Sequence, residues 1–337
     1  MPSAPPVGVV IANHNNGPFI ERAIESAARQ SVRDLRIVVV DDASTDDSDE
    51  AIRRCLSRLD DERIRYLKLE RNVGQGGALR RGAAMLEAPF ICFLDADDVW
   101  YEDFVGRHLS AHLNTDFPVA LTYCDSYIID AHDRLLAGTA WFFDSVDLHD
   151  ETPRGIDAHR IPVIDGASGT LGYAAQPAMT LYPQWSPARS TNTTSGMMLR
   201  RPFVDLVLRP PDEDLRLYVD FYLGTFACLL TGSIAIHQAL YGYRMHGSNK
   251  HSNASVPGGA YNSSSRPWGP IRDAGLGLIQ RVLKSESDEM RRIFGENRHD
   301  VALALVADAL GQAPAEPAAA DRRWKLSALF SRPSSRM

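Results

Sequence analysis

Short apolar runs alternate with amphipathic stretches along the first hundred residues of the chain. Four runs of strand length are almost continuously apolar, which is typical of strands buried on both faces of a parallel sheet. They are residues 7–12, 35–40, 64–69 and 90–94. The three stretches between them carry apolar residues at helical spacing. They are residues 19–29, 47–59 and 78–86. The alternation predicts an α/β fold of Rossmann type, with a mostly parallel sheet and helices on both faces.

Regular structure is also expected further along the chain. The pattern predicts helices over 101–113 and 218–230, strands over 119–123, 194–201 and 233–243, and a short helix from Pro202. Residues 131–190 show no period, and they form either a substrate-covering loop or a packed insertion. After His251 a Ser, Gly, Asn and Pro-rich linker precedes a helical C-terminal extension. Residues 313–337 are Ala/Pro-rich and then basic, which predicts a disordered tail.

Three carboxylates follow the fourth apolar run directly. They are Asp95, Asp97 and Asp98. Open α/β sheets bind ligands at the carboxyl ends of their strands. Two carboxylates two residues apart suit Mg²⁺ or Mn²⁺, with substrate phosphates completing the ligand shell. The alternative is a turn or a helix N-cap, since Asp is favoured in both.

Composition narrows the class of protein. The chain has 36 Lys and Arg against 43 Asp and Glu, a net charge of -7, which argues against non-specific nucleic-acid binding. No signal peptide or membrane-spanning segment is apparent. The four scattered cysteines fit a reducing compartment, so we expect a cytoplasmic protein that can work at the inner face of the membrane. The basic tail either contacts a membrane surface peripherally or is solvated.

The run from Val7 to Trp100 resembles the nucleotide-sugar-binding half of glycosyltransferase family 2, which has the GT-A fold. The resemblance rests on four motifs in order: a first strand ending in Asn-x-Asn, Gln30-Ser31, Val-Asp-Asp-x-Ser-Thr-Asp at 40–46, and Asn72 with Gly74 and residues 78–83 before Leu-Asp-Ala-Asp-Asp at 94–98. It weakens in the middle of the chain and returns at 195–197, 219–220 and 243–246. It implies transfer of a sugar, with inversion, from a nucleotide-sugar donor to a hydroxyl acceptor in glycan or polysaccharide biosynthesis.

The resemblance also implies how the chain is divided. Residues 1–125 would be the nucleotide-sugar-binding half and 126–250 the acceptor-binding half of one domain. Residues 251–312 would be a helical extension, and 313–337 the tail. UDP is the expected nucleotide, with dTDP or GDP as alternatives, and the acceptor would be a glycan, a lipid-linked glycan or another hydroxyl compound.

Roles at the nucleotide follow from the same resemblance. Asp42 would accept a hydrogen bond from the base or ribose, because an acid buried behind an apolar strand needs a donor. The alternative is helix capping. The loop that contains Ala12 and His14 would lie near the base. His14 would stack on the base, or it would be an ordinary surface histidine.

The acidic turn would hold the metal. By resemblance Asp97 is the main ligand, Asp95 reaches the ribose or the metal, and His246 adds a metal or phosphate contact. Imidazole suits Mn²⁺ better than Mg²⁺, although a lone histidine is more often structural. The bound cation would stabilise the leaving nucleoside diphosphate.

Asp220 would be the catalytic general base, in a segment where a charge is otherwise out of place. The family usually has Glu-Asp here, whereas this chain has Val219-Asp220. The nearby acids 212–214 are competitors for the role. Asp220 could also serve only as a partner of the helix dipole.

The stretch Gly74-Gln75-Gly76-Gly77 allows two interpretations. It is either a close-approach loop beside the nucleotide, contacting it through Gln75, or a simple turn. Arg80 or Arg81 behind it could reach phosphate. The stretch also resembles part of a dinucleotide fingerprint, which leaves an NAD(P) oxidoreductase of Rossmann type as a second hypothesis. A non-catalytic nucleotide-sugar-binding protein is the third.

Overall fold

The computed structural model describes most of the chain. The described residues are 4–115, 117–139, 163–164, 171–172, 179–186, 191, 193–216, 218–247, 249 and 268–312. Most of the irregular stretch 131–190, the linker after His251 and the tail 313–337 lie outside these residues, as do the predictions made for them.

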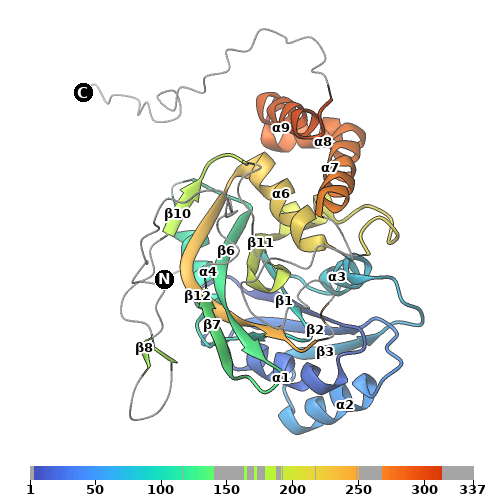
Figure 1. Cartoon of the computed structure of the whole chain (residues 1–337), viewed down its shortest axis with the longest axis vertical. Helices are drawn as coiled ribbons and strands as arrows, with labels where there is room; N and C mark the ends of the chain where they lie inside the picture. The colour runs from blue at the N-terminus through green and yellow to red at the C-terminus, as the bar shows by residue number, and fades with distance from the viewer. Residues whose placement is uncertain are drawn as a thin grey trace.

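One large mixed sheet forms the centre of the molecule (Figure 1). Its strands run in the order β10-β12-β6-β11-β4-β1-β2-β3, and β5 and β7 pair with β12 and β6. The strands are β1 (Val7–Asn13), β2 (Leu35–Asp41), β3 (Ile64–Lys68), β4 (Phe90–Asp95), β5 (Val99–Trp100), β6 (Leu121–Asp130), β7 (Leu135–Thr139), β10 (Met179–Tyr182), β11 (Met197–Arg200) and β12 (Ser233–Met245). β8 (Val163–Ile164) and β9 (Leu171–Gly172) form a separate two-stranded sheet.

The first four predicted strands form the parallel part of this sheet. β1 is central and pairs in parallel with β2 on one side and β4 on the other, and β2 pairs in parallel with β3. Ala12 lies opposite both Val40 and Asp95, so the carboxyl ends of β1, β2 and β4 are level. This register brings the polar residues that follow these strands to one edge, as the sequence predicted.

The second half of the chain extends the sheet. β11 joins it antiparallel to both β4 and β6, and β12 then pairs in parallel with β6. The helices are α1 (Gly17–Ala28), α2 (Ser48–Leu59), α3 (Gln75–Ala84), α4 (Phe104–Leu113), α5 (Arg201–Val207), α6 (Val219–Thr231), α7 (Trp268–Ser285), α8 (Ser287–Phe294) and α9 (Glu296–Ala309), with a 3-10 turn η2 (Thr194–Gly196).

Helices cover both faces of the sheet because successive strand side chains point to opposite sides. Val9 and Ile11 of β1 pack into a core shared with α1, α2 and α4. Val10, between them, packs into the other core with α3, α5 and α6. The three C-terminal helices lie together over α6 at the top of Figure 1 and share that second core. The predicted α/β class, with helices on both faces and C-terminal helices, is therefore confirmed.

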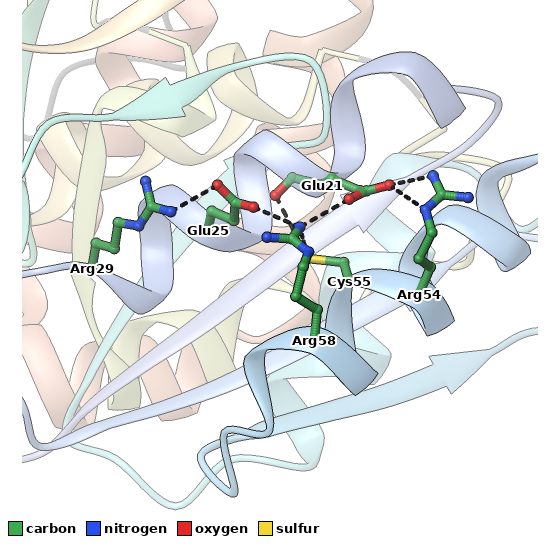
Figure 2. Close-up of polar contacts among 6 residues, drawn as sticks. All are labelled: Glu21, Glu25, Arg29, Arg54, Cys55 and Arg58. Atoms are coloured by element: carbon green, nitrogen blue, oxygen red, sulfur yellow. Dashed lines mark hydrogen bonds and ion pairs between the residues drawn. The ribbon is translucent and has the colours of Figure 1, made fainter.

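Ion pairs join α1 to α2 across their exposed surface (Figure 2). Arg58 contacts Glu21 at 3.0 Å and Glu25 at 2.6 Å, while Arg54 also contacts Glu21 and Arg29 contacts Glu25 at 3.1 Å. Exposed pairs of this kind contribute roughly 0–1 kcal/mol each, so burial of the apolar faces beneath them dominates the packing of the two helices. No helix within the described ranges has the length and apolar character needed to cross a membrane.

Candidate active site

The acidic turn lies where β4 ends at the level carboxyl edge. Both carboxylate oxygens of Asp95 are held: Gln75 Nε2 donates to Oδ1 and Thr194 Oγ1 donates to Oδ2, each at 2.8 Å. The Asp95 amide donates to Ser195 Oγ at 3.1 Å. Burial raises the pKa of Asp95 to about 7, and the negative charges of Asp97 and Asp220 add to the effect. The turn is therefore fixed from α3 and from η2, and the carboxylates of Asp95 and Asp97 repel each other.

Asp97 and His246, the two residues predicted to bind the metal with Asp95, face each other; metal binding itself stays a prediction. His246 Nε2 lies 3.2 Å from Asp97 Oδ2. The side chains are 7% and 23% exposed, respectively, so both groups have limited access to solvent. The imidazole packs on Phe19 of α1, with ring centroids 4.6 Å apart, and the His246 amide donates to Asn249 Oδ1 at 2.8 Å. The ring of His246 and its backbone are therefore both held in place by neighbouring residues.

Arg244 supports the acidic turn through hydrogen bonds to Asp97 and Asp98, a role that was not predicted from the sequence. Its side chain is fully buried, and Nε donates to the carbonyl oxygen of Asp97 at 2.6 Å. Its amide donates to Asp98 Oδ1 at 3.0 Å. The guanidinium also lies 5.1 Å from the centre of the Phe19 ring. Asp98 is 2% exposed, and burial raises its pKa, as do the nearby charges of Asp97 and Asp95. Asp98 is therefore buried inside the turn, where it accepts the Arg244 amide.

Asp220 lies in the first turn of α6, as predicted. Its Oδ1 accepts a hydrogen bond from the Phe221 amide at 2.8 Å, and burial raises the pKa of the carboxyl. Its charge contributes to the raised pKa of Asp95, so Asp220 lies near enough to act on that carboxyl. Tyr218, which precedes the helix, has a left-handed backbone with φ of 60°. Such a conformation is costly for a bulky residue and persists only where the surrounding structure enforces it.

The competing acid Asp212 is engaged elsewhere. Both of its oxygens form ion pairs, one with Arg80 and one with Arg81 at 2.9 Å. The Arg80 side chain also donates to the carbonyl oxygen of Pro210 at 2.7 Å. Both arginines therefore have partners within the protein, so their charges do not need a bound phosphate for compensation.

The glycines 74, 76 and 77 are required by a close approach within the protein. A Cβ at Gly74 would lie 2.7 Å from Arg216 Cα, and one at Gly76 would lie 2.5 Å from the carbonyl oxygen of Leu215. Gln75 and Gly76 donate their amides to the carbonyls of Arg216 and Leu215. The prediction that these residues form a loop before the helix was wrong, because α3 begins at Gln75. Packing against the segment 212–216, and not a dinucleotide fingerprint, accounts for the glycines.

Asp42, which was predicted to contact the nucleotide, follows β2 and lies beside His14. Asp42 is 3% exposed, and its two oxygens accept the amides of Val73 at 2.7 Å and Gly74 at 2.8 Å. These amides are the donors that a buried acid needs. His14 Nδ1 donates to the Asp42 carbonyl at 2.9 Å, and Ala12 lies in β1 opposite Asp95. Contact of these residues with a nucleotide stays a prediction.

The fold, with its open sheet and flanking helices, is similar to that of GT-A glycosyltransferases. The fold agrees with a solved structure, that of S. aureus TarS 1-349 in complex with UDP. The likeness covers 89% of this chain and 70% of that chain, with a TM-score of 0.50 and 16% sequence identity.

The sequence itself identifies the family. Residues 8–174 match the sequence model of glycosyl transferase family 2, and the chain belongs to this family. An uncharacterized glycosyltransferase of Nostoc sp. is 27% identical over 249 residues, which is 74% of this chain and 67% of the relative. The UDP-Glc:alpha-D-GlcNAc-diphosphoundecaprenol beta-1,3-glucosyltransferase WfaP of Escherichia coli is 30% identical over 122 residues, 36% of this chain and 46% of that enzyme. Because the chain belongs to a family of glycosyltransferases, we conclude that it is an enzyme of this class. The oxidoreductase and the non-catalytic binding-protein hypotheses are therefore set aside.

Proposed function

We propose that the enzyme transfers a sugar from a UDP-linked donor to a hydroxyl group of a lipid-linked or growing glycan, with inversion at the sugar carbon. The observation that carries the proposal is the acidic turn at the level carboxyl edge of β1, β2 and β4, where both oxygens of Asp95 are held and Asp97 faces His246. The charge of Asp220 contributes to the raised pKa of Asp95, which supports its nearness to this turn. The E. coli relative, by its name, uses UDP-Glc and a diphosphoundecaprenol-linked acceptor, which supports the same classes of donor and acceptor here.

Asp220 is the general base in this proposal. Its carboxylate takes the proton of the acceptor hydroxyl while that oxygen forms a bond to the anomeric carbon. The bond from this carbon to the diphosphate breaks, and its electron pair leaves with the nucleoside diphosphate. Because burial raises the pKa of Asp220, the carboxylate is a stronger base than an exposed aspartate. A single displacement of this kind inverts the configuration of the sugar.

The other residues of the site position the donor. Gln75 and Thr194 fix both oxygens of Asp95, so this carboxylate has one orientation toward the ribose side of the donor. Asp42 holds the loop at Val73 and Gly74, and with His14 and Ala12 it forms the base end of the site. Each of these contacts with the donor is part of the proposal.

The chemistry of the available ligands fits a divalent cation. Asp97 and His246 supply one carboxylate and one imidazole 3.2 Å apart, and the three carboxylates of the turn outnumber the arginine, Arg244, that contacts it. Within the described ranges no three His, Cys, Asp or Glu side chains converge as a complete metal site, so diphosphate oxygens and water would complete the shell. When bound, Mn²⁺ or Mg²⁺ would neutralise the charge that develops on the leaving diphosphate.

Binding and hydrolysis of a panel of UDP-, dTDP- and GDP-sugars, each with Mn²⁺, with Mg²⁺ and with EDTA, test this function. One donor class should bind and turn over only with metal. Asp97→Asn should lose metal-dependent binding and turnover. Asp220→Asn should bind the donor normally and lose about 10²–10⁴-fold in rate.

Asp205→Asn is the matched control, because Asp205 is a half-exposed aspartate on α5 that forms an ion pair with Arg201 on the same helix. It should retain the wild-type rate. Donor hydrolysis that is indifferent to EDTA and to Asp97→Asn would overturn the metal assignment. A wild-type rate in Asp220→Asn would overturn the assignment of the base.

A further inference from the structure

The first turn of α6 is held under strain, and its position decides where Asp220 lies. Tyr218 has φ of 60° immediately before the helix, a backbone region that L residues with large side chains rarely adopt. The amide of Tyr222 donates to the carbonyl of Tyr218 at 3.1 Å, which closes the first turn around Asp220. Strain at a single residue is kept only when packing on the adjoining element enforces it. The elements that pack on α6 therefore matter for the site.

Helix α7 approaches this turn closely at one glycine. A Cβ added at Gly275 would lie 2.7 Å from Cε1 and 2.8 Å from Cδ1 of Phe221, the residue next to Asp220. Glycine is unfavourable in the interior of a helix, so a glycine here needs a reason, and the Phe221 ring supplies one. A Cβ added at Gly277 of the same helix would meet no atom within 4 Å. The close approach is specific to Gly275.

The C-terminal helices also hold the far end of α6. Arg298 of α9 donates to the carbonyl oxygen of Leu230, in the last turn of α6, at 2.9 Å. Between the two ends, Leu276, Ile279 and Leu283 of α7 are fully buried in the core that α6 occupies. Helix α6 is thus fixed at its first turn by α7 and at its last turn by α9 (Figure 1).

We propose that Gly275 is a positioning residue for the reaction, and that the C-terminal helices set the place of the catalytic base. Gly275 leaves room for the Phe221 ring beside α7, so the ring does not push the turn that carries Asp220 out of place. The inference rests on the proposed role of Asp220 as the base. It assigns a catalytic purpose to a segment that lies beyond the part of the chain matched by the family model.

A pair of glycine substitutions tests the proposal. Gly275→Ala and Gly277→Ala add the same methyl group to the same helix and gain the same helix propensity. Hydrolysis of the preferred nucleotide sugar from the panel above gives kcat and donor KM, and UDP binding and the thermal midpoint are measured beside them. We expect Gly275→Ala to lower kcat by about 10- to 100-fold, because a small displacement of a reacting group is costly in rate. Donor KM and UDP binding should not change, and Gly277→Ala should match the wild type.

A compensating substitution separates positioning from a loss of folded protein. Phe221→Leu removes ring atoms that the new methyl group would meet, so Gly275→Ala/Phe221→Leu should recover most of the lost kcat. Equal kcat in Gly275→Ala and Gly277→Ala would overturn the proposal. A kcat loss that follows only the fraction of unfolded protein, without rescue, would also overturn it.

Asp220→Asn distinguishes this failure from failure of the proposed function. If Asp220→Asn is inactive and Gly275→Ala is fully active, only the positioning role is lost. If Asp220→Asn is fully active, Asp220 is not the base and both proposals fail.

Discussion

Two buried histidines on α4 should make the fold sensitive to mild acid. His108 is fully buried and its Nδ1 lies 2.7 Å from Thr122 Oγ1. His112 is 2% exposed and its Nε2 donates to the Met198 carbonyl at 3.2 Å. Burial lowers the pKa of His108 well below 6.5, and the neighbouring His112 lowers it further. Burial also lowers the pKa of His112 to about 3, and the charge of Arg200 adds to this shift.

The size of the effect follows from proton linkage. An unfolded chain would bind a proton on each ring below pH about 6.5, whereas the folded chain keeps both rings neutral. Stability from these groups is therefore complete above pH about 6.5 and is lost as the pH falls, for His112 until its folded pKa of about 3. Each neutral histidine costs about 1.4 kcal/mol per pH unit in this window. Between pH 6.5 and pH 5 the pair should lower the free energy of unfolding by about 3 kcal/mol, because the unfolded rings are only half protonated at pH 6.5.

Urea unfolding at intervals from pH 4 to pH 7 measures this dependence. His112→Gln removes one titrating ring and keeps an N–H donor for the Met198 carbonyl. Its plot of unfolding free energy against pH should be less steep than that of the wild type by about 1.4 kcal/mol per pH unit between pH 4 and 6. The comparison uses slopes, so a constant loss of stability in the variant does not affect it. Identical slopes for wild type and His112→Gln would refute the reasoning.

Two further substitutions test contacts that support the site. Gly76→Ala should lower the free energy of unfolding by about 1–3 kcal/mol, because its Cβ would lie 2.5 Å from the Leu215 carbonyl oxygen, and urea unfolding measures the loss. Arg244→Met should lower it by about 2 kcal/mol or more, since the carbonyls of Asp97 and Asp130 lose their buried donor at about 1–3 kcal/mol each. An unchanged urea midpoint in Gly76→Ala would contradict the close approach at Gly76. An unchanged midpoint in Arg244→Met would contradict the stabilising role of the Arg244 hydrogen bonds.

The parallel half of the fold could be predicted from sequence because its signals are local. Each of its strands is a continuous apolar run, and each intervening helix has an apolar face with the right period. The acids after β2 and β4 could be located for the same reason, since a charge at the end of a buried run has few places to lie. The prediction failed where a strand buries polar groups. β6 was expected to end at Tyr123, but it continues to Asp130 through Asp125 and Ser126, which are 1% and 0% exposed.

The roles of the glycines and of Arg244 could not be read in the same way, because they depend on contacts between distant parts of the chain. Gly76 meets Leu215, and Arg244 donates to Asp97, across more than a hundred residues in each case. Nothing in the residues next to Gly76 distinguishes a turn, a phosphate loop and a packing site. Likewise β5, at two residues, is too short to show a period, and only its pairing with β12 defines it.

These long-range contacts form one continuous support for the proposed chemistry. The Asp42 carboxylate holds the amides of Val73 and Gly74, and the residues that follow, Gln75 and Gly76, donate their amides to the segment that leads into α6. The Gln75 side chain at the same time holds Asp95. The proposed donor end, the acidic turn and the turn that carries Asp220 therefore share the start of α3. A displacement at any one of them should reach the others through this helix end, so the proposed nucleotide-binding and acceptor-binding halves should act as one unit.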